Sequence, residues 1–178
     1  RPRRGAARLN IDWHYCLGNH EARISRCIES DPAKLEGVMS LDDLTAGSPV
    51  PWVVHDYLRP VFIGGGGGVA FSHYFTSGVM GRAVGGENPA ATILRKQMVS
   101  CVQGHTHTLD FAERTSPTPD GRGRKISSLV CGYFGEYEEW AGVQTNALWS
   151  PGVAVLHVAD GGFDFEWWSY ERIRRRYG

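Results

Sequence analysis

Three short apolar segments of the chain each end in polar side chains of the types that bind metals. The segments span residues 9–17, 69–75 and 98–103, and their β-branched, aromatic and apolar residues predict buried strands. The polar side chains near their ends are Asn19, His20, Glu21, His73, His105 and His107. Loops at the carboxyl ends of strands build the site in α/β folds, because side chains from several strands converge there. The sequence therefore predicts an α/β fold in which these side chains meet at one edge of a sheet.

The remaining pattern places helices early in the chain and paired strands late. Helices are expected at residues 21–30, 30–44 and 90–97, at the basic C-terminal end, and as the end of a helix at 1–8. Strands are expected at residues 61–63, which a glycine turn joins to 69–75, at 125–134, and as a hairpin over 152–170. Residues 111–124, rich in Pro, Gly and Asp, are expected to form a polar loop. This order predicts an α/β sandwich with sheets inside and helices outside.

Composition limits the function classes. The 178 residues suffice for one compact domain, and the 42% hydrophobic content excludes disorder. Nineteen basic residues balance nineteen acidic ones, so net charge gives no argument for nucleic acid or a membrane surface. Arginines cluster at both ends of the chain, where solvated tails are the expected state and a polyanion contact is the alternative.

Cysteine usage and hydropathy bear on location. The four cysteines form no CxxC pair and no disulfide framework, which favours a reducing, cytoplasmic compartment. No apolar run approaches 18 residues, and no apolar segment follows the N-terminal arginines, so neither a membrane span nor a signal peptide is expected.

The ordered set GNHE, a lone His and GHTH resembles the second half of the calcineurin-like metallophosphoesterase signature. The resemblance to the family is close over residues 9–108. More loosely, the sequence also resembles phage-type members of that family. It implies a single domain over residues 1–178, a metallophosphoesterase-type β-sandwich flanked by helices. It also implies hydrolysis of phosphomonoesters or phosphodiesters, with nucleotides or nucleic acid as candidate substrates and the oligomeric state left open.

The resemblance also implies roles for the polar residues. Asn19, His73 and His105 would bind one metal, and His107 would bind the other. Imidazole and amide oxygen suit Mn, Fe, Ni, Co or Zn. His20 would act beside the scissile phosphate as a general acid or as a stabiliser of charge, and Glu21 would orient His20. Two metals about 3.5–4 Å apart would bind a bridging hydroxide and clamp the phosphoryl oxygens.

The first two motifs of that signature, an Asp-x-His and a Gly-Asp, are absent. Only 18 residues precede Asn19. Asp12-Trp13-His14 matches the letters, but a strand rises about 3.3 Å per residue, which puts His14 roughly 15 Å back from Asn19. We therefore expect a domain incomplete at its N-terminus, with weak metal binding and little turnover. A partial reading frame, a split enzyme completed by a second chain, and a catalytically inactive binding or structural module are the open explanations.

Other motifs favour structural roles. The glycines of residues 63–69 lack the Gly-Lys-Ser/Thr ending of a phosphate-binding loop, so a hairpin turn is expected. Thr76 and Ser77 lie near His73 in sequence but have no evident relay partner. The side chains expected to be structural or exposed are Asp12, His14, His55, Asp56, His157, Trp167, Trp168 and Tyr170.

Overall fold

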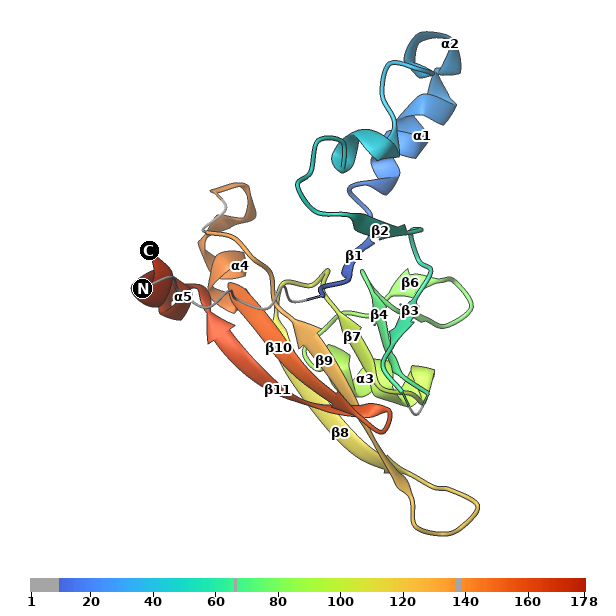
Figure 1. The fold of residues 1–178 in the computed structure, drawn as a ribbon, viewed down its shortest axis with the longest axis vertical. Coiled ribbons are helices and arrows are strands. Elements are labelled where there is room, and N and C mark those ends of the chain that lie inside the picture. The colour runs from blue at the N-terminus through green and yellow to red at the C-terminus, as the bar shows by residue number, and fades with distance from the viewer. Residues whose placement is uncertain (1–9, 66, 137–138) are drawn as a thin grey trace, which may run out of the picture.

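A mixed five-stranded sheet forms the centre of the computed structural model, which describes residues 10–65, 67–136 and 139–178 (Figure 1). Its strands, in spatial order, are β3 (Val61–Ile63), β4 (Val69–Ser72), β7 (Cys101–Gln103), β9 (Arg124–Cys131) and β8 (Leu109–Ser116). The three central strands β4, β7 and β9 are parallel to one another, whereas the edge strands β3 and β8 run antiparallel to their neighbours. The carboxyl ends of β4 and β7 consequently lie side by side.

Each face of this sheet is covered by a different element. Side chains alternate between the two faces along each strand, so one strand contributes to both layers. Helix α3 (Pro89–Gln97) covers one face, where the buried cluster comprises Ala70, Phe75, Val84, Ala90, Ile93, Cys101 and Val130. The hairpin of β10 (Gly152–Ala159) and β11 (Gly162–Ser169) covers the other face, where the buried residues are Val69, Val102, Leu129 and Phe163.

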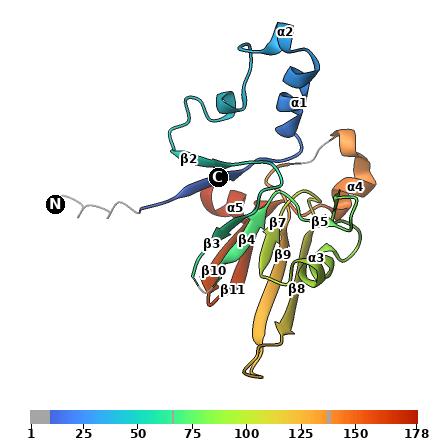
Figure 2. The same cartoon turned by 90° about the vertical axis from the view of Figure 1, so that its right-hand side faces the viewer.

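A second, smaller unit is built from the first part of the chain. Strands β1 (Trp13–Cys16) and β2 (Trp52–His55) pair in parallel as a two-stranded ribbon. Between them lie α1 (Ala22–Ser30), α2 (Pro32–Leu35) and the 3₁₀-helix η1 (Leu41–Leu44), which extend away from the sheet in Figure 1. Figure 2 shows the ribbon lying across one end of the five-stranded sheet. A 2.6 Å contact between the hydroxyls of Tyr57 and Tyr74 ties the two units together.

The remaining elements are short. They are β5 (Thr76–Ser77), β6 (Arg82–Ala83), the 3₁₀-helix η2 (Glu139–Ala141), α4 (Gly142–Leu148) and α5 (Tyr170–Tyr177). None of the helices in the described ranges has the length and apolar character needed to cross a membrane.

The predicted mixed α/β character is confirmed, and so are most of the elements. Helices appear over 22–30, 89–97 and 170–177, the glycine segment joins two antiparallel strands, and the late hairpin pairs in register. The first strand is shorter than predicted, and the predicted helical end at residues 1–8 lies outside the described residues. β2 was not predicted from its short apolar run between prolines.

The predicted polar loop at residues 111–124 was wrong over its first half. Residues 109–116 form β8, which pairs with β9 along its whole length, and only the following residues make the turn. An edge strand needs one backbone partner and can expose polar side chains, so its composition hides it from pattern analysis. Phe111 packs on Phe165 of the hairpin, and Asp110 accepts a hydrogen bond from the Ala90 amide of α3 at 2.9 Å.

Candidate metal site

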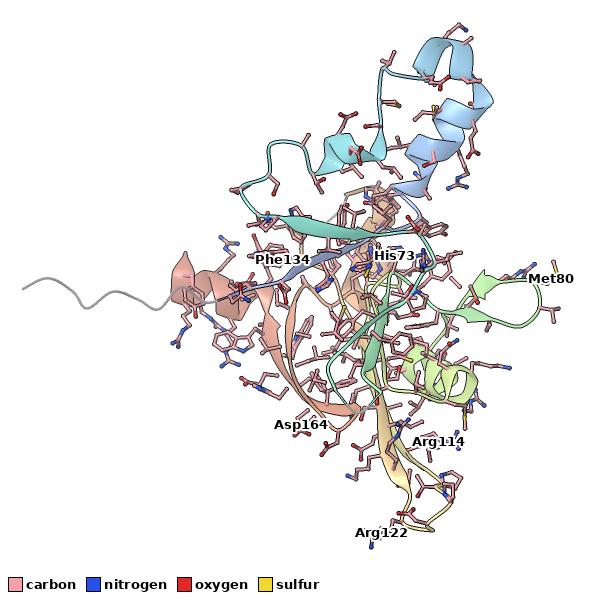
Figure 3. The ribbon with its side chains drawn as sticks, turned by 45° about the vertical axis from the view of Figure 1, so that its right-hand side comes forward. His73, Met80, Arg114, Arg122, Phe134 and Asp164 are labelled. Atoms are coloured by element: carbon pink, nitrogen blue, oxygen red, sulfur yellow. The ribbon has the colours of Figure 1, made fainter. Side chains whose placement is uncertain are left out.

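Three of the predicted ligands converge where the ribbon meets the sheet. His73 and His105 follow β4 and β7, which are neighbouring parallel strands of the five-stranded sheet. Asn19 follows β1, which belongs to the separate ribbon, so the prediction that all these side chains meet at the edge of a single sheet was wrong for Asn19. The Nε2 atom of His73 lies 2.7 Å from Asn19 Oδ1 and 3.1 Å from His105 Nδ1. His73 is labelled at this junction in Figure 3. Residues far apart in the sequence thus present one oxygen and two nitrogen donors to a common point.

The chemistry of these donors fits a divalent cation. The amide oxygen of Asn19 only accepts hydrogen bonds, and a neutral imidazole carries a single N–H. One proton on His73 Nε2 therefore cannot serve both of its neighbours well, whereas a cation can receive lone pairs from all three atoms. Ligands about 2.1 Å from one ion lie about 3.0–3.4 Å apart. The 3.1 Å distance between His73 Nε2 and His105 Nδ1 lies in this range. The 2.7 Å distance between His73 Nε2 and Asn19 Oδ1 is shorter, so these two atoms would have to move slightly apart to bind one ion.

Burial keeps the two imidazoles neutral. Loss of water, together with the neighbouring His105, lowers the pKa of His73 from 6.5 to about 4. Burial and the nearby His107 lower the pKa of His105 as well. Because a metal binds the neutral imidazole, both rings are in the ligand form near neutral pH.

The loop that carries the GHTH residues has an unusual backbone. His105 and His107 both lie in the left-handed region, with φ of 64° and 61°. Such values are uncommon outside glycine, although His is among the residues enriched there, and they cluster at functional sites. The amide of Ser150 donates to the His107 carbonyl at 2.8 Å, and the Leu109 amide donates to Ser150 Oγ at 3.1 Å. The backbone and side chain of Ser150 therefore hold the C-terminal half of this loop.

His107 lies against an aromatic wall. Its ring stacks on Tyr133, with 4.9 Å between centroids, and meets Trp149 edge-on at 4.4 Å. His107 lines the same pocket as the three converging residues, but the contacts that define the convergence point involve Asn19, His73 and His105.

His20 and Glu21 occupy different positions. His20 is exposed and lines the pocket. Glu21 Oε2 accepts a hydrogen bond from the Gly18 amide at 2.8 Å, and its Oε1 accepts one from the Tyr15 hydroxyl at 3.1 Å. Burial opposes ionisation of Glu21, but these hydrogen bonds and one from its own amide outweigh burial and lower its pKa. Its hydrogen bond to Gly18 thus closes the turn that contains Asn19.

The pocket above these residues has a volume of about 430 Å³. It is lined by Tyr15, Cys16, Asn19, His20, Glu21, His73, His105, Thr106, His107, Trp140 and Trp149. All six predicted site residues are therefore brought to one cavity. Sequence reasoning missed Tyr15, Trp140 and Trp149; a tyrosine close to the end of a strand offered a weak signal, and the two tryptophans offered none.

No protein-family model matches the sequence, and neither a curated protein nor a solved structure matches it. Across the described residues, no three His, Cys, Asp or Glu side chains are grouped closely enough to hold a metal. The donor set at the convergence point accordingly consists of two imidazoles and one amide.

The three histidines set aside, His14, His55 and His157, have structural contacts. His14 Nδ1 lies 2.8 Å from His55 Nε2 across the ribbon, and the two rings stack. His157 pairs with Glu166 at 3.0 Å on the exposed face of the late hairpin.

Proposed function

We propose that the chain is a divalent-metal-dependent phosphoesterase that hydrolyses phosphomonoesters or phosphodiesters. The observation that carries this proposal is the convergence of Asn19 Oδ1 and His105 Nδ1 on His73 Nε2 in the lining of a pocket. A cation bound by these atoms would polarise a phosphoryl oxygen and lower the pKa of a bound water. His107 would serve a second ion, and the metals would come from the Mn, Fe, Ni, Co and Zn group.

The chain's own residues have distinct tasks in this proposal. His20, exposed in the pocket, would donate a proton to the leaving oxygen or offset its charge. Glu21 would hold the Gly18 turn and so fix the direction of Asn19, which is a positioning role exercised through Gly18 and Tyr15. The fold that accompanies this proposal is a metallophosphoesterase-type β-sandwich, with the five-stranded sheet and the β10–β11 hairpin as its layers and α3 outside them.

A substitution pair tests this function. His105→Ala removes one donor, and His157→Ala serves as the matched control because it removes a histidine on the exposed face of the hairpin. Calorimetric titration with Mn²⁺ or Zn²⁺ should show binding to the wild-type chain and to His157→Ala, and at least tenfold weaker binding to His105→Ala. Hydrolysis of an aryl phosphate ester should follow the same order. Equal metal binding by all three proteins would contradict the proposal.

A catalytically inactive binding or structural module on the same scaffold is the second candidate. It is favoured by the shortage of carboxylates, since Glu21 is the one acid among the described residues that line the pocket and both its oxygens accept hydrogen bonds. Metal binding without any hydrolysis of aryl phosphate, even with Mn²⁺ or Zn²⁺ in excess, would support this module over the enzyme.

A further inference from the structure

The pocket has two chemically different parts. One part of its lining consists of the converging donors Asn19, His73 and His105, and another is a row of aromatic rings that begins at His107. Trp149 lies 4.4 Å from His107 and 5.7 Å from Trp140, measured between ring centroids. The row therefore runs from a candidate metal ligand outward to Trp140 at the rim.

Trp140 is a large aromatic side chain with 74% of its surface exposed. Tryptophan is well buried on average, and an exposed one beside a pocket leaves an extended apolar ring in water. Trp149 contacts Trp140 with the ring planes tilted at 59°, and Tyr133 packs on Trp149 in turn, with 5.4 Å between their centroids. The exposed indole of Trp140, which contacts Trp149, is thus a flat apolar surface at the edge of a polar cavity.

The spacing of the row selects the kind of group that fits. Ring centroids 4.4–5.7 Å apart are in direct contact, so nothing can enter between the rings. An aromatic cage for a quaternary ammonium group needs rings that stand apart around the cation. A single exposed face, in contrast, suits a planar ring stacked on it, as bases stack on aromatic side chains.

The charge and volume of the pocket both bear on the size of the ligand that it can bind. Proteins that hold polynucleotides contact successive phosphates with Lys and Arg. None of the described residues that line the pocket is Lys or Arg. A volume of about 430 Å³ lies within the range of small-molecule sites. These features favour a single nucleotide over a nucleic-acid strand.

We propose that the substrate of this site is a nucleoside phosphate whose phosphate faces Asn19, His73 and His105 and whose base stacks on Trp140. This inference rests on the proposed function for the role of the phosphate end, but the stacking of the base stands on the aromatic row. Trp140 is then a specificity-determining residue.

Ligand-observed saturation-transfer NMR on the metal-free chain tests the stacking without any need for catalysis. The probes are adenosine 5′-monophosphate, ribose 5-phosphate, phosphocholine and a short single-stranded oligonucleotide. The variants are Trp140→Ala, Trp140→Phe and, as the matched control, Phe62→Ala, which removes an exposed aromatic ring on β3 outside the pocket. Base protons of the mononucleotide should receive saturation from the wild type, Phe62→Ala and Trp140→Phe. Trp140→Ala should bind roughly 5- to 150-fold more weakly, the range for loss of one base stack.

Each other outcome overturns the inference. These outcomes are no saturation of the base in the wild type, saturation that Trp140→Ala retains, a Trp140-dependent signal from phosphocholine alone, or an oligonucleotide that binds far more tightly than the mononucleotide through Trp140. An aryl phosphate assay run in parallel separates the two proposals. Base binding without hydrolysis leaves the stacking site standing and removes the phosphoesterase, whereas hydrolysis without base binding does the reverse.

Discussion

The glycines that precede the candidate ligands differ in what they do, although the sequence shows them in similar settings. A Cβ added to Gly18 would lie 2.8 Å from Glu21 Oε2 and 2.8 Å from two atoms of the His73 ring. A Cβ added to Gly104 would have no heavy atom within 4 Å. Neither glycine has a positive φ. Gly18 is therefore needed for space beside the site, and Gly104 is not.

This contrast gives a matched pair of substitutions. Gly18→Ala should push His73 and Glu21 out of position, weaken Mn²⁺ or Zn²⁺ binding at least tenfold, and destabilise the fold by about 1–3 kcal/mol, as overpacking does. Gly104→Ala should leave both quantities close to wild type. Calorimetry and chemical denaturation measure the two effects. If Gly18→Ala binds metal as the wild type does, the packing described around His73 is wrong.

At the scale of elements, one buried side chain fastens the segment after His73 to strand β7. Gln103 is 1% exposed; its Oε1 accepts from the Phe75 amide at 2.9 Å, and its Nε2 donates to the Val84 carbonyl at 3.3 Å. Both partners are backbone groups that water does not reach easily, so they depend on this side chain.

Gln103→Leu should therefore be strongly destabilising. Each buried backbone group left without a partner costs about 1–3 kcal/mol, so the loss should be about 2–6 kcal/mol by chemical denaturation. Ser128→Ala is the control, because Ser128 Oγ on the adjacent strand is buried and has no hydrogen-bond partner among the described residues. Its removal should change stability by less than about 1 kcal/mol. Similar losses for the two variants would refute the bridging role of Gln103.

The β1–β2 ribbon should respond to pH. Burial, the nearby His14 and, more weakly, Arg59 lower the pKa of His55, whereas Asp56 opposes the shift. The pKa of His55 in the folded protein lies below the ordinary 6.5, so the folded ribbon favours the neutral ring. The contribution of neutral His55 to the stability of the ribbon is therefore fully present above pH 6.5 and is lost as the pH falls below 6.5.

Hydrogen exchange measures this effect directly. Protection of the amides of residues 13–16 and 52–55, corrected for intrinsic exchange, should fall between pH 7 and pH 5, while that of β9 should change less. His55→Gln should flatten the dependence, since it removes the titrating ring. A wild-type ribbon equally protected at both pH values would show that the pair of histidines does not control it.

For the whole molecule, the proximity of the candidate ligands was easier to predict from the sequence than the residues that surround them. The proximity of His73 and His105 could be predicted because the neighbouring parallel strands β4 and β7 end at one edge of the sheet. Asn19 also follows an apolar strand, but β1 belongs to the separate ribbon, so its approach to His73 depends on where the ribbon lies. The partners of Glu21 could not be predicted, because they depend on the path of a turn rather than on a pattern. Trp140 lies in a 3₁₀-helix with no periodic signal, and its place at the pocket follows from tertiary packing alone.

The same limit applies to the layers of the fold. Alternation of apolar and polar residues in the sequence predicted the hairpin of β10 and β11, because one face of this hairpin packs on the sheet. Strand β8, at the edge of the sheet, carries polar residues and was hidden, and β2 is four residues long. Strand pairing between distant segments is a property of the complete chain, so sequence pattern alone recovers such strands poorly.

The central claim is that Asn19, His73 and His105 together hold a divalent cation. Anomalous diffraction from crystals soaked in Zn²⁺ or Mn²⁺ tests it most directly. The account predicts a peak about 2.0–2.3 Å from His73 Nε2, Asn19 Oδ1 and His105 Nδ1, and no peak there in His73→Ala crystals. A cation bound elsewhere, or a wild-type pocket that stays empty at millimolar metal, would contradict the account.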